Sequence, residues 1–473
     1  MSLLDQASLV LVPSAIKTGE VLVQKPLPTK FSDETGNYDG NDPQGSANLT
    51  FTRASNASRV NADGLIEKVR TNLILQSNTF DTTWAALDLT PTSGQSGYDG
   101  SSDAWLLDRT NSNGRIYQTI SFTSVGTFSV YAKAGTLNWI RLRDNLGEGS
   151  YFDLSGSGAI GSTSSTITPA IQSIGGGWFR CSVSALWNSF NFRIYPADAD
   201  NDTSGTSGNV YIQNAQLETG LVATDYIPTT TSARSTFAGI TVDGTSVPNV
   251  PRLDYSGGCP SLLLEPQTTA LNQFSEQIDN AYWTNANCTV TANQTASPSG
   301  YVDAELVLDD TSNNQHVITR SIAVTSGNKY TASFFLKAAG YTTSAIRMGN
   351  GSLWTGGTGP TVEFDLVALT GTVVDGSGVT FTIEDYGNGW RRCSVTGTCV
   401  TSGTTVFSLY VKQYNGYIGS GTDGIYAWGA NITATGYLQS YIPTLSAAVT
   451  RVAETAVKTG ISSLIGQTEG TAF

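Results

Sequence analysis

The chain has 473 residues and a formal net charge of −13 at pH 7, with 25 Lys or Arg, 38 Asp or Glu and a single histidine. Charged residues make up 13% of the sequence, about half of the usual fraction of roughly 25%, and 50 glycines accompany an aromatic content of 10%. This composition indicates an all-β protein with many turns. It argues against charge-driven nucleic-acid binding and, because no apolar run approaches about 18 residues, against a membrane span.

The first 69 residues are expected to form a region of their own. Residues 7–13 (ASLVLVP) predict a strand, and the polar stretch 32–46, with several Gly, Asn and Asp residues, predicts a loop. The segment 72–84 that follows allows a short helix ahead of the first long strands.

The rest of the chain is dominated by short runs in which apolar and polar residues alternate. Examples are 127–132 (TFSVYA), 139–143 (WIRLR), 190–195 (FNFRIY) and 406–412 (VFSLYVK). A period of two predicts half-buried antiparallel strands, and turn residues recur at intervals of about ten residues. Together these features predict β-sandwich or jelly-roll domains, in which each sheet buries one face against the other.

The same landmarks occur twice and in the same order. Residues 175–183 (GGGWFRCSV) match 387–395 (GNGWRRCSV), and 225–229 (DYIPT) match 440–444 (SYIPT). Such an ordered repeat predicts two homologous domains. The predicted division of the chain is an N-terminal region 1–69, a jelly-roll module 70–230, a linker 231–261, a second jelly-roll module 262–445 and a tail 446–473.

The sequence offers no recognisable catalytic site. The single histidine, His316, argues against Ser-His-Asp and Cys-His chemistry. The five cysteines contain no C-x-x-C pair, and Cys181 and Cys393 hold matching positions in the two copies, which predicts free thiols in two cores. We therefore expect no enzymatic activity, although a pair of carboxylates suited to glycoside hydrolysis would not be visible at this level.

Several landmarks resemble a family of phage virion proteins. Residues 72–84, which carry NLILQS, an FD pair and a tryptophan, are similar to the opening of that family. Residues 131–135 (YAKAG), 177–181 (GWFRC) and 226–229 (YIPT) are similar to its later landmarks. The N-terminal stretch 2–10 (SLLDQASLV) resembles virion proteins of phages that infect Bacteroidetes-type hosts, including crAss-like phages.

The resemblance implies carbohydrate-binding-like jelly-roll modules in a head or tail fibre of a phage particle. It implies that residues 1–69 anchor the chain to other virion proteins of the capsid, collar or tail, and that the chain is a homo-oligomer, with a trimer favoured. The protein would be located in the virion, after folding in the cytoplasm of the host bacterium, and would adhere to host or environmental glycans. Two alternatives remain open: a purely structural decoration protein that binds no sugar, and a polysaccharide depolymerase.

Tryptophans without a counterpart in the other copy are the main candidates for sugar binding. An exposed aromatic ring can stack on the apolar face of a sugar, while neighbouring polar side chains bind the hydroxyl groups. The adhesive hypothesis predicts at least one solvent-facing aromatic shelf, whereas the structural alternative predicts that these tryptophans are buried. The candidate residues are Trp139, Arg141, Arg143, Asp144, Trp187, Arg193, Tyr195 and Trp354.

A second candidate site is a loop that places aspartates at alternate positions, Asp198, Asp200 and Asp202. Such carboxylates can converge on calcium, which takes about six to eight oxygen ligands. The loop lacks the glycine and the distant glutamate of an EF-hand, and the matching loop 413–423 has no such cluster. A solvated hairpin tip is therefore the simpler interpretation, and no other cofactor is expected.

Overall fold

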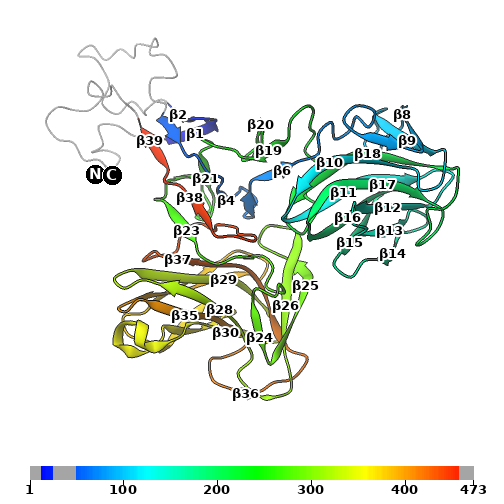
Figure 1. Ribbon diagram of the computed structural model, residues 1–473. Helices are drawn as coiled ribbons and strands as arrows, with labels where there is room; N and C mark the ends of the chain where they lie inside the picture. Colours follow the sequence, from blue (N-terminus) through cyan, green and yellow to red (C-terminus); the bar gives the residue numbers. More distant parts are fainter. Residues whose placement is uncertain (1–11, 25–48, 458–473) are drawn as a thin grey trace, which may run out of the picture.

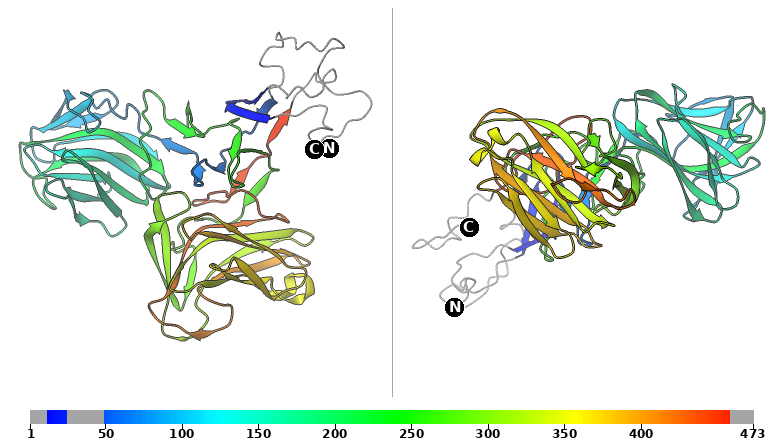
Figure 2. Two further views of the ribbon diagram at one scale, coloured as in Figure 1. Left: turned by 180° about the vertical axis from the view of Figure 1, so that it is seen from behind. Right: turned by 90° about the horizontal axis from the view of Figure 1, so that it is seen from below.

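The computed structural model describes residues 12–24 and 49–457. Two large β-sandwiches, module 1 (73–229) and module 2 (268–451), extend from a smaller group of sheets (Figure 1). Figure 2 shows these three parts from behind and from below. The predicted all-β class, with tandem antiparallel β-sandwich domains, is confirmed. We call the smaller group of sheets the hub, and it comprises residues 12–24, 49–72, 230–267 and 452–457.

Module 1 consists of two six-stranded antiparallel sheets packed face to face. Across the first sheet, the order is β14 (Ala159–Thr163), β13 (Gly149–Asp153), β12 (Trp139–Asp144), β17 (Ser189–Ala197), β10 (Arg115–Phe122) and β7 (Ala85–Leu87). Across the second sheet, the order is β15 (Thr168–Gly175), β16 (Trp178–Leu186), β11 (Val125–Ala134), β18 (Asn209–Thr219), β9 (Ala104–Arg109) and β8 (Leu89–Gln95). Alternate side chains point inward, so Phe128, Val183 and Phe192 from both sheets meet in one core.

Module 2 repeats this strand order. Its first sheet runs β32 (Thr370–Asp375), β31 (Thr361–Asp365), β30 (Thr343–Met348), β35 (Gly403–Tyr410), β28 (Val317–Val324) and β24 (Thr284–Ala286). Its second sheet runs β33 (Thr380–Asp385), β34 (Arg391–Thr398), β29 (Lys329–Ala339), β37 (Gly424–Thr433), β26 (Val302–Asp309) and β25 (Cys288–Ala296). The additional elements are β23 (Thr268–Ala270), which pairs with β37 and β38 (Val449–Arg451), the two-stranded pair β27 (Asn313–Asn314) and β36 (Tyr417–Ile418), and two 3₁₀ turns, η1 (Gly351–Leu353) and η2 (Thr355–Gly357).

The hub joins segments that are far apart in the sequence. In the described residues, a strand from 446–473 completes a sheet formed by strands from 1–69, and strands from 231–261 form a sheet with residues 70–72, which directly precede module 1. One sheet runs β1 (Val12–Lys17), β2 (Glu20–Gln24), β3 (Leu49–Thr52) and β39 (Thr455–Val457), and another runs β20 (Ile240–Asp243), β19 (Arg234–Phe237) and β6 (Arg70–Asn72). Two further pairs are β21 (Arg252–Asp254) with β22 (Ser261–Leu263), and β4 (Ser58–Val60) with β5 (Ile66–Lys68).

A buried cluster of charges fixes the hub to module 2. Three arginines, Arg53, Arg252 and Arg451, surround two glutamates, Glu265 and Glu454, and all five side chains are at most 9% exposed. Glu454 bonds to Arg53 at 2.7 Å and also pairs with Arg252, whereas Glu265 bonds to Arg252 at 2.8 Å and to Arg451 at 2.9 Å. Burial alone would raise the pKa of Glu265, but the guanidinium groups of Arg451 and Arg252 lower it below its usual value.

The duplicated glycine–tryptophan turns place two tryptophans at equivalent strand starts. Gly177 and Gly389 have φ angles of 79° and 84°, in the left-handed region that favours glycine. The tryptophans that follow, Trp178 and Trp390, are 3% and 2% exposed, so the repeat encodes a packing residue in each module.

The expectation of a short helix over 72–84 is wrong. The Oδ1 atom of Asn72 accepts backbone N–H groups of Ile74 at 3.0 Å and Leu217 at 3.1 Å, and its Nδ2 donates to Ile227. These bonds fasten the segment along β18, where it forms turns instead of a helix. The described part of the chain contains no helix long and apolar enough to span a membrane.

Candidate functional site

Strands β12 and β17 are neighbours, and their register gathers five of the predicted glycan-binding residues on one surface. On β12, Ile140 and Leu142 point into the core of module 1, so Trp139, Arg141 and Arg143 point outward. The list of direct cross-strand partners is Trp139 with Ala197, Arg141 with Tyr195 and Arg143 with Arg193. The outer face of the first sheet therefore carries arginines beside Tyr195, which they cover so that it is only 3% exposed.

Three residues that the sequence analysis did not single out complete this surface. Arg115 and Tyr117 lie on β10, where Tyr117 is directly opposite Arg193, and Tyr151 on β13 is directly opposite Arg141. We call the whole set the arginine–tyrosine face. Its members are Arg115, Tyr117, Trp139, Arg141, Arg143, Tyr151, Arg193 and Tyr195.

Guanidinium groups cover the tyrosine rings of this face. Such cation–π contacts hold long arginine side chains in defined positions. The distances from guanidinium carbon to ring centroid are 4.7 Å for Arg141 and Tyr151, 5.7 Å for Arg143 and Tyr195, 5.6 Å for Arg115 and Tyr195, and 5.9 Å for Arg193 and Tyr117. The polar groups of the face are therefore the guanidinium N–H groups and the tyrosine hydroxyls, arranged around the aromatic rings.

The charges on this face repel one another. Burial lowers the pKa of Arg143, and the neighbouring positive charges of Arg141 and Arg193 lower it further, against the opposing effects of Tyr195 and Asp144. Burial raises the pKa of the Tyr151 hydroxyl, because it disfavours the charged form there too. The face is thus a partly desolvated positive surface, on which an electronegative ligand atom would relieve repulsion.

Trp139 lies at the edge of the face and is half-buried. A Cβ atom added to Gly161, on the neighbouring part of β14, would meet the Trp139 ring at 2.6 Å and the carboxylate of Asp200 at 2.4 Å. The Trp139 indole and the Asp200 carboxylate therefore lie so close to this backbone position that only glycine fits there. Asp200 is itself fixed, because it accepts the N–H of Ser162 at 2.6 Å and its hydroxyl at 2.9 Å.

Three of the predicted glycan-binding residues lie elsewhere. Trp187 is 3% exposed and donates its indole N–H to the carbonyl of Gly126 at 2.8 Å, and Trp354 is 1% exposed and donates to the carbonyl of Gly349 at 3.0 Å. Both are core residues, so neither supplies a solvent-facing ring. Asp144 is also buried, because strand alternation turns it inward, and its Oδ1 accepts three backbone N–H groups of the following turn.

The three aspartates of the predicted calcium loop do not converge. Asp198 forms two bonds with Arg109, at 2.8 Å and 2.5 Å, Asp200 binds Ser162, and Asp202 accepts the N–H of Ser204 at 2.8 Å. No group of three or more His, Cys, Asp or Glu side chains suited to a metal ion occurs in residues 12–24 and 49–457. The arginine pairing of Asp198 explains why alternate spacing did not produce a common site.

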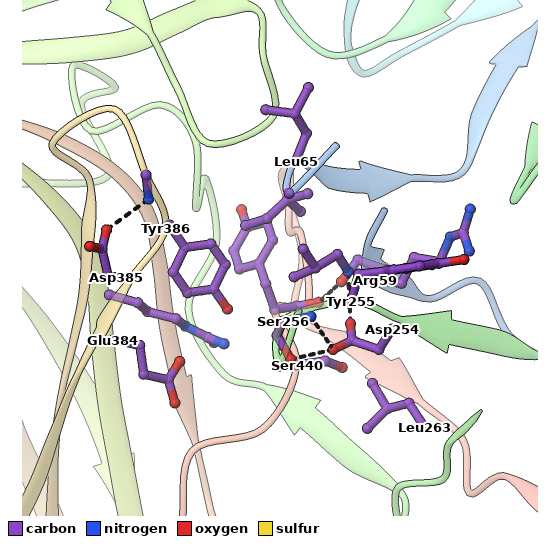
Figure 3. Close-up of a pocket in the computed structure, with 18 of the residues that line it drawn as sticks. Arg59, Leu65, Asp254, Tyr255, Ser256, Leu263, Glu384, Asp385, Tyr386 and Ser440 are labelled. Atoms are coloured by element: carbon purple, nitrogen blue, oxygen red, sulfur yellow. Dashed lines mark hydrogen bonds between the residues drawn. The ribbon is translucent and has the colours of Figure 1, made fainter. Parts of the chain in front are cut away.

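A separate cleft of about 690 Å³ lies between the hub and module 2. Figure 3 shows Glu384, Asp385 and Tyr386 on one wall, with Asp254 and Tyr255 on the other. Facing carboxylates in a cleft are what the polysaccharide-cleaving alternative requires. However, both oxygens of Asp254 accept hydrogen bonds from the hub, and Asp385 is bound to the arginine at position 391. These two aspartates hold local structure together.

The chain matches no protein-family model and no curated protein. Among solved structures, it is similar to the tandem CBM22-1–CBM22-2 domain of Paenibacillus barcinonensis Xyn10C, with 12% identity, a TM-score of 0.22, and coverage of 81% of this chain and 100% of that one. It is also similar to the tandem CBM51 modules of Sp3GH98 from Streptococcus pneumoniae SP3-BS71, with 11% identity, a TM-score of 0.18, and coverage of 82% and 99%. Similarities of this size establish no relationship, so the fold assignment rests on the strand order given above.

Proposed function

We propose that this chain is a non-catalytic adhesive protein of a bacteriophage particle, and that it binds surface glycans with the arginine–tyrosine face of module 1. The observation that carries the adhesive part is the register of β10, β12, β13 and β17, which gathers aromatic rings and hydrogen-bond donors on one surface. A sugar can lay its C–H face on an aromatic ring while its hydroxyl groups bond to neighbouring polar side chains. Trp139 and Tyr117 are the aromatic members that remain partly exposed.

The phage part of the proposal is supported by the sequence landmarks that resemble virion proteins. In this proposal residues 1–69 attach the chain to a capsid, collar or tail protein, and copies of the chain assemble as a homotrimer in a head or tail fibre. The protein folds in the host cytoplasm before it enters the virion. Many copies on one particle raise weak glycan contacts to useful avidity.

A glycan array tests the adhesive part. The complete chain is applied to capsular and lipopolysaccharide glycans, together with the variants Trp139→Ala and Tyr117→Ala. Tyr437→Ala serves as the control, since Tyr437 is 55% exposed but lies in module 2, away from the proposed face. We expect glycan binding that both face variants reduce and the control retains. Equal binding by all variants would place adhesion elsewhere on the chain.

Immunogold labelling of purified particles tests the phage part. Antibodies against module 1 should label the surface of virions from a phage that encodes this chain, at a head or tail fibre. Label found only in the lysate, and not on particles, would contradict the proposed location.

The second candidate is a purely structural virion protein, and one observation favours it. Trp187 and Trp354 are buried, as that alternative expects of the unduplicated tryptophans. Only Trp139, which is half-buried, departs from the expectation of the structural alternative that these tryptophans are buried. If a correctly assembled oligomer binds no glycan on the array while particles carry the label, the structural function replaces the adhesive one.

A further inference from the structure

The four arginines of the arginine–tyrosine face have no carboxylate partner among the residues that the structure describes. Arginines elsewhere in the chain are commonly paired, as Arg109 is with Asp198 and Arg391 with Asp385. The hydrogen bonds of the four go to neutral oxygens. These are Arg115 Nη1 to the Asn113 carbonyl at 3.2 Å, Arg141 Nη2 to the Gly147 carbonyl at 3.4 Å, Arg143 Nε to the Asp144 carbonyl at 3.0 Å and Arg193 Nε to Asn191 Oδ1 at 2.7 Å.

This concentration of positive charge runs against the composition of the chain. The net charge is −13, yet the face gathers four arginines over three neighbouring strands, β10, β17 and β12. The carboxylates of this region accept hydrogen bonds from other donors. Asp144 is buried beneath the turn that follows β12, and Asp200 accepts two bonds from Ser162. Asp153, directly opposite Trp139 on β13, accepts the N–H of Ser155 at 2.9 Å. The positive charge of the face is therefore left for something outside the chain.

Module 2 provides an internal comparison, because its strands pair in the same register. Arg143 and Tyr195 correspond to Arg347 and Tyr410, which keep the residue type. The other six members have changed. Module 2 has Val317 for Arg115, Thr319 for Tyr117, Thr343 for Trp139, Ala345 for Arg141, Glu363 for Tyr151 and Ser408 for Arg193.

Arg347, the arginine that this face of module 2 retains, lies near a carboxylate and is covered by a tyrosine ring. Arg347 lies 3.8 Å from the carboxylate of Asp375, and its guanidinium carbon lies 4.5 Å from the ring centroid of Tyr414. Tyr414 is in turn held by its backbone N–H, which donates to Glu363 at 2.9 Å. The same sheet position is thus open and positive in module 1 but closed and neutral in module 2.

We propose that the arginine–tyrosine face of module 1 selects polysaccharides that bear carboxylate groups, and that the corresponding face of module 2 does not bind them. This inference rests on the proposed adhesive function and names the class of glycan. The planar guanidinium group donates two parallel hydrogen bonds to a carboxylate, and it is weakly hydrated, which suits a partly buried surface. The sugar rings between carboxylates supply the C–H faces that contact Trp139 and Tyr117.

An acidic polysaccharide fits this face better than a nucleic acid does. Duplex DNA carries one negative charge about every 1.7 Å along its axis. A chain with a net charge of −13 repels such a polyanion, and one patch of four arginines does not offset this repulsion. A uronic acid polymer spaces its charges more widely and presents sugar rings between them.

The test measures binding of the complete chain to polygalacturonate, alginate and hyaluronate, with fully methyl-esterified polygalacturonate as the uncharged match and a single-stranded DNA oligonucleotide as the other polyanion. The variant Arg141→Ala with Arg193→Ser places the residues of module 2 in module 1, which that sheet already accommodates. Arg347→Ala in module 2 is the matched control. Thermal unfolding and circular dichroism confirm that both variants fold.

We expect binding to at least one acidic polymer that weakens as salt increases and that methyl esterification reduces about tenfold or more. The double variant should weaken it by about tenfold for each arginine removed, since each removal deletes charge-assisted hydrogen bonds, and Arg347→Ala should not change it. Equal affinity for the esterified polymer, tighter binding of DNA, or no binding to any of the three acidic polymers would each overturn the inference. If neutral glycans on the array still bind through Trp139, the adhesive function survives without acid selection; if no glycan binds at all, both fail.

Discussion

The buried charge cluster of the hub makes a stability prediction that can be worked out from its contacts. Glu454 accepts bonds from Arg53 at 2.7 Å and from the Nε atom of Arg252 at 2.8 Å, and the side chains of all three are 0% exposed. Removing one partner of a buried ion pair costs about 3–5 kcal/mol, because the remaining charge is buried without compensation. Glu454→Gln keeps the size of the side chain but removes the charge between two arginines, so we expect a loss of that size.

Hydrogen exchange of backbone amides is the appropriate assay, because the hub can be followed separately from the two modules. A loss of about 3–5 kcal/mol corresponds to exchange that is roughly a hundredfold to a few thousandfold faster in peptides covering β3 and β39. The core strands β11 and β29 should keep their protection. Asp243→Asn is the control, since the Arg234–Asp243 pair is exposed and worth about 0–1 kcal/mol.

Two results would refute this reasoning. Unchanged exchange in the hub would mean that Glu454 does not compensate the two arginines. Exchange that rises equally in the hub and in both modules would mean that the hub is not a separate structural unit, but part of one cooperative fold.

Three further predictions concern the cores. Trp187→Ala should destabilise module 1 by about 3–5 kcal/mol in chemical denaturation, since it removes a buried indole, and a cost below about 1 kcal/mol would contradict its assignment to the core. Burial raises the pKa of Glu305 well above its usual range, so the folded state keeps the Glu305 carboxyl protonated. The stability that this protonated carboxyl contributes is present at low pH and is lost as pH rises through the raised pKa. Glu305→Gln, which stays neutral, should therefore melt higher than the parent chain at about pH 8 and reduce the fall in melting temperature above about pH 5; a lower melting temperature at pH 8 would oppose this account. Finally, Cys259 is exposed, whereas burial raises the pKa of Cys181 and Cys393, so a thiol reagent should modify Cys259 rapidly and the other two only after unfolding, and rapid modification of either buried thiol would show that its core is open.

The strands could be predicted from the sequence because their alternation is local. The run 139–143 shows which side chains share a face, and so does 190–195. Their adjacency, by contrast, depends on the topology of the sheet, because about fifty residues separate them along the chain. Tyr117 and Tyr151 were missed for that reason, although each alternates with a core residue in the same way as the arginines.

The errors at the candidate sites have a common physical cause. Absence from the other copy does not determine whether a tryptophan is exposed, and both Trp187 and Trp354 find a carbonyl acceptor inside the core. The alternate spacing of the aspartates in the 198–202 loop also did not bring their carboxylates together, because Asp198 pairs with Arg109. In each case, packing or pairing within the fold decides the role of the residue. The partners of Trp187 and Asp198 are distant in the sequence, whereas Trp354 bonds to the nearby Gly349 inside the core.

A crystal structure of the complete chain with an acidic oligosaccharide, a galacturonate hexamer, tests the central claim most directly. The account predicts sugar density over β12 and β17 of module 1, with carboxylates bonded to Arg141 or Arg193 and a ring against Trp139 or Tyr117. Density in the cleft beside Tyr386, or over Arg347 of module 2, with the face of module 1 empty, would contradict it.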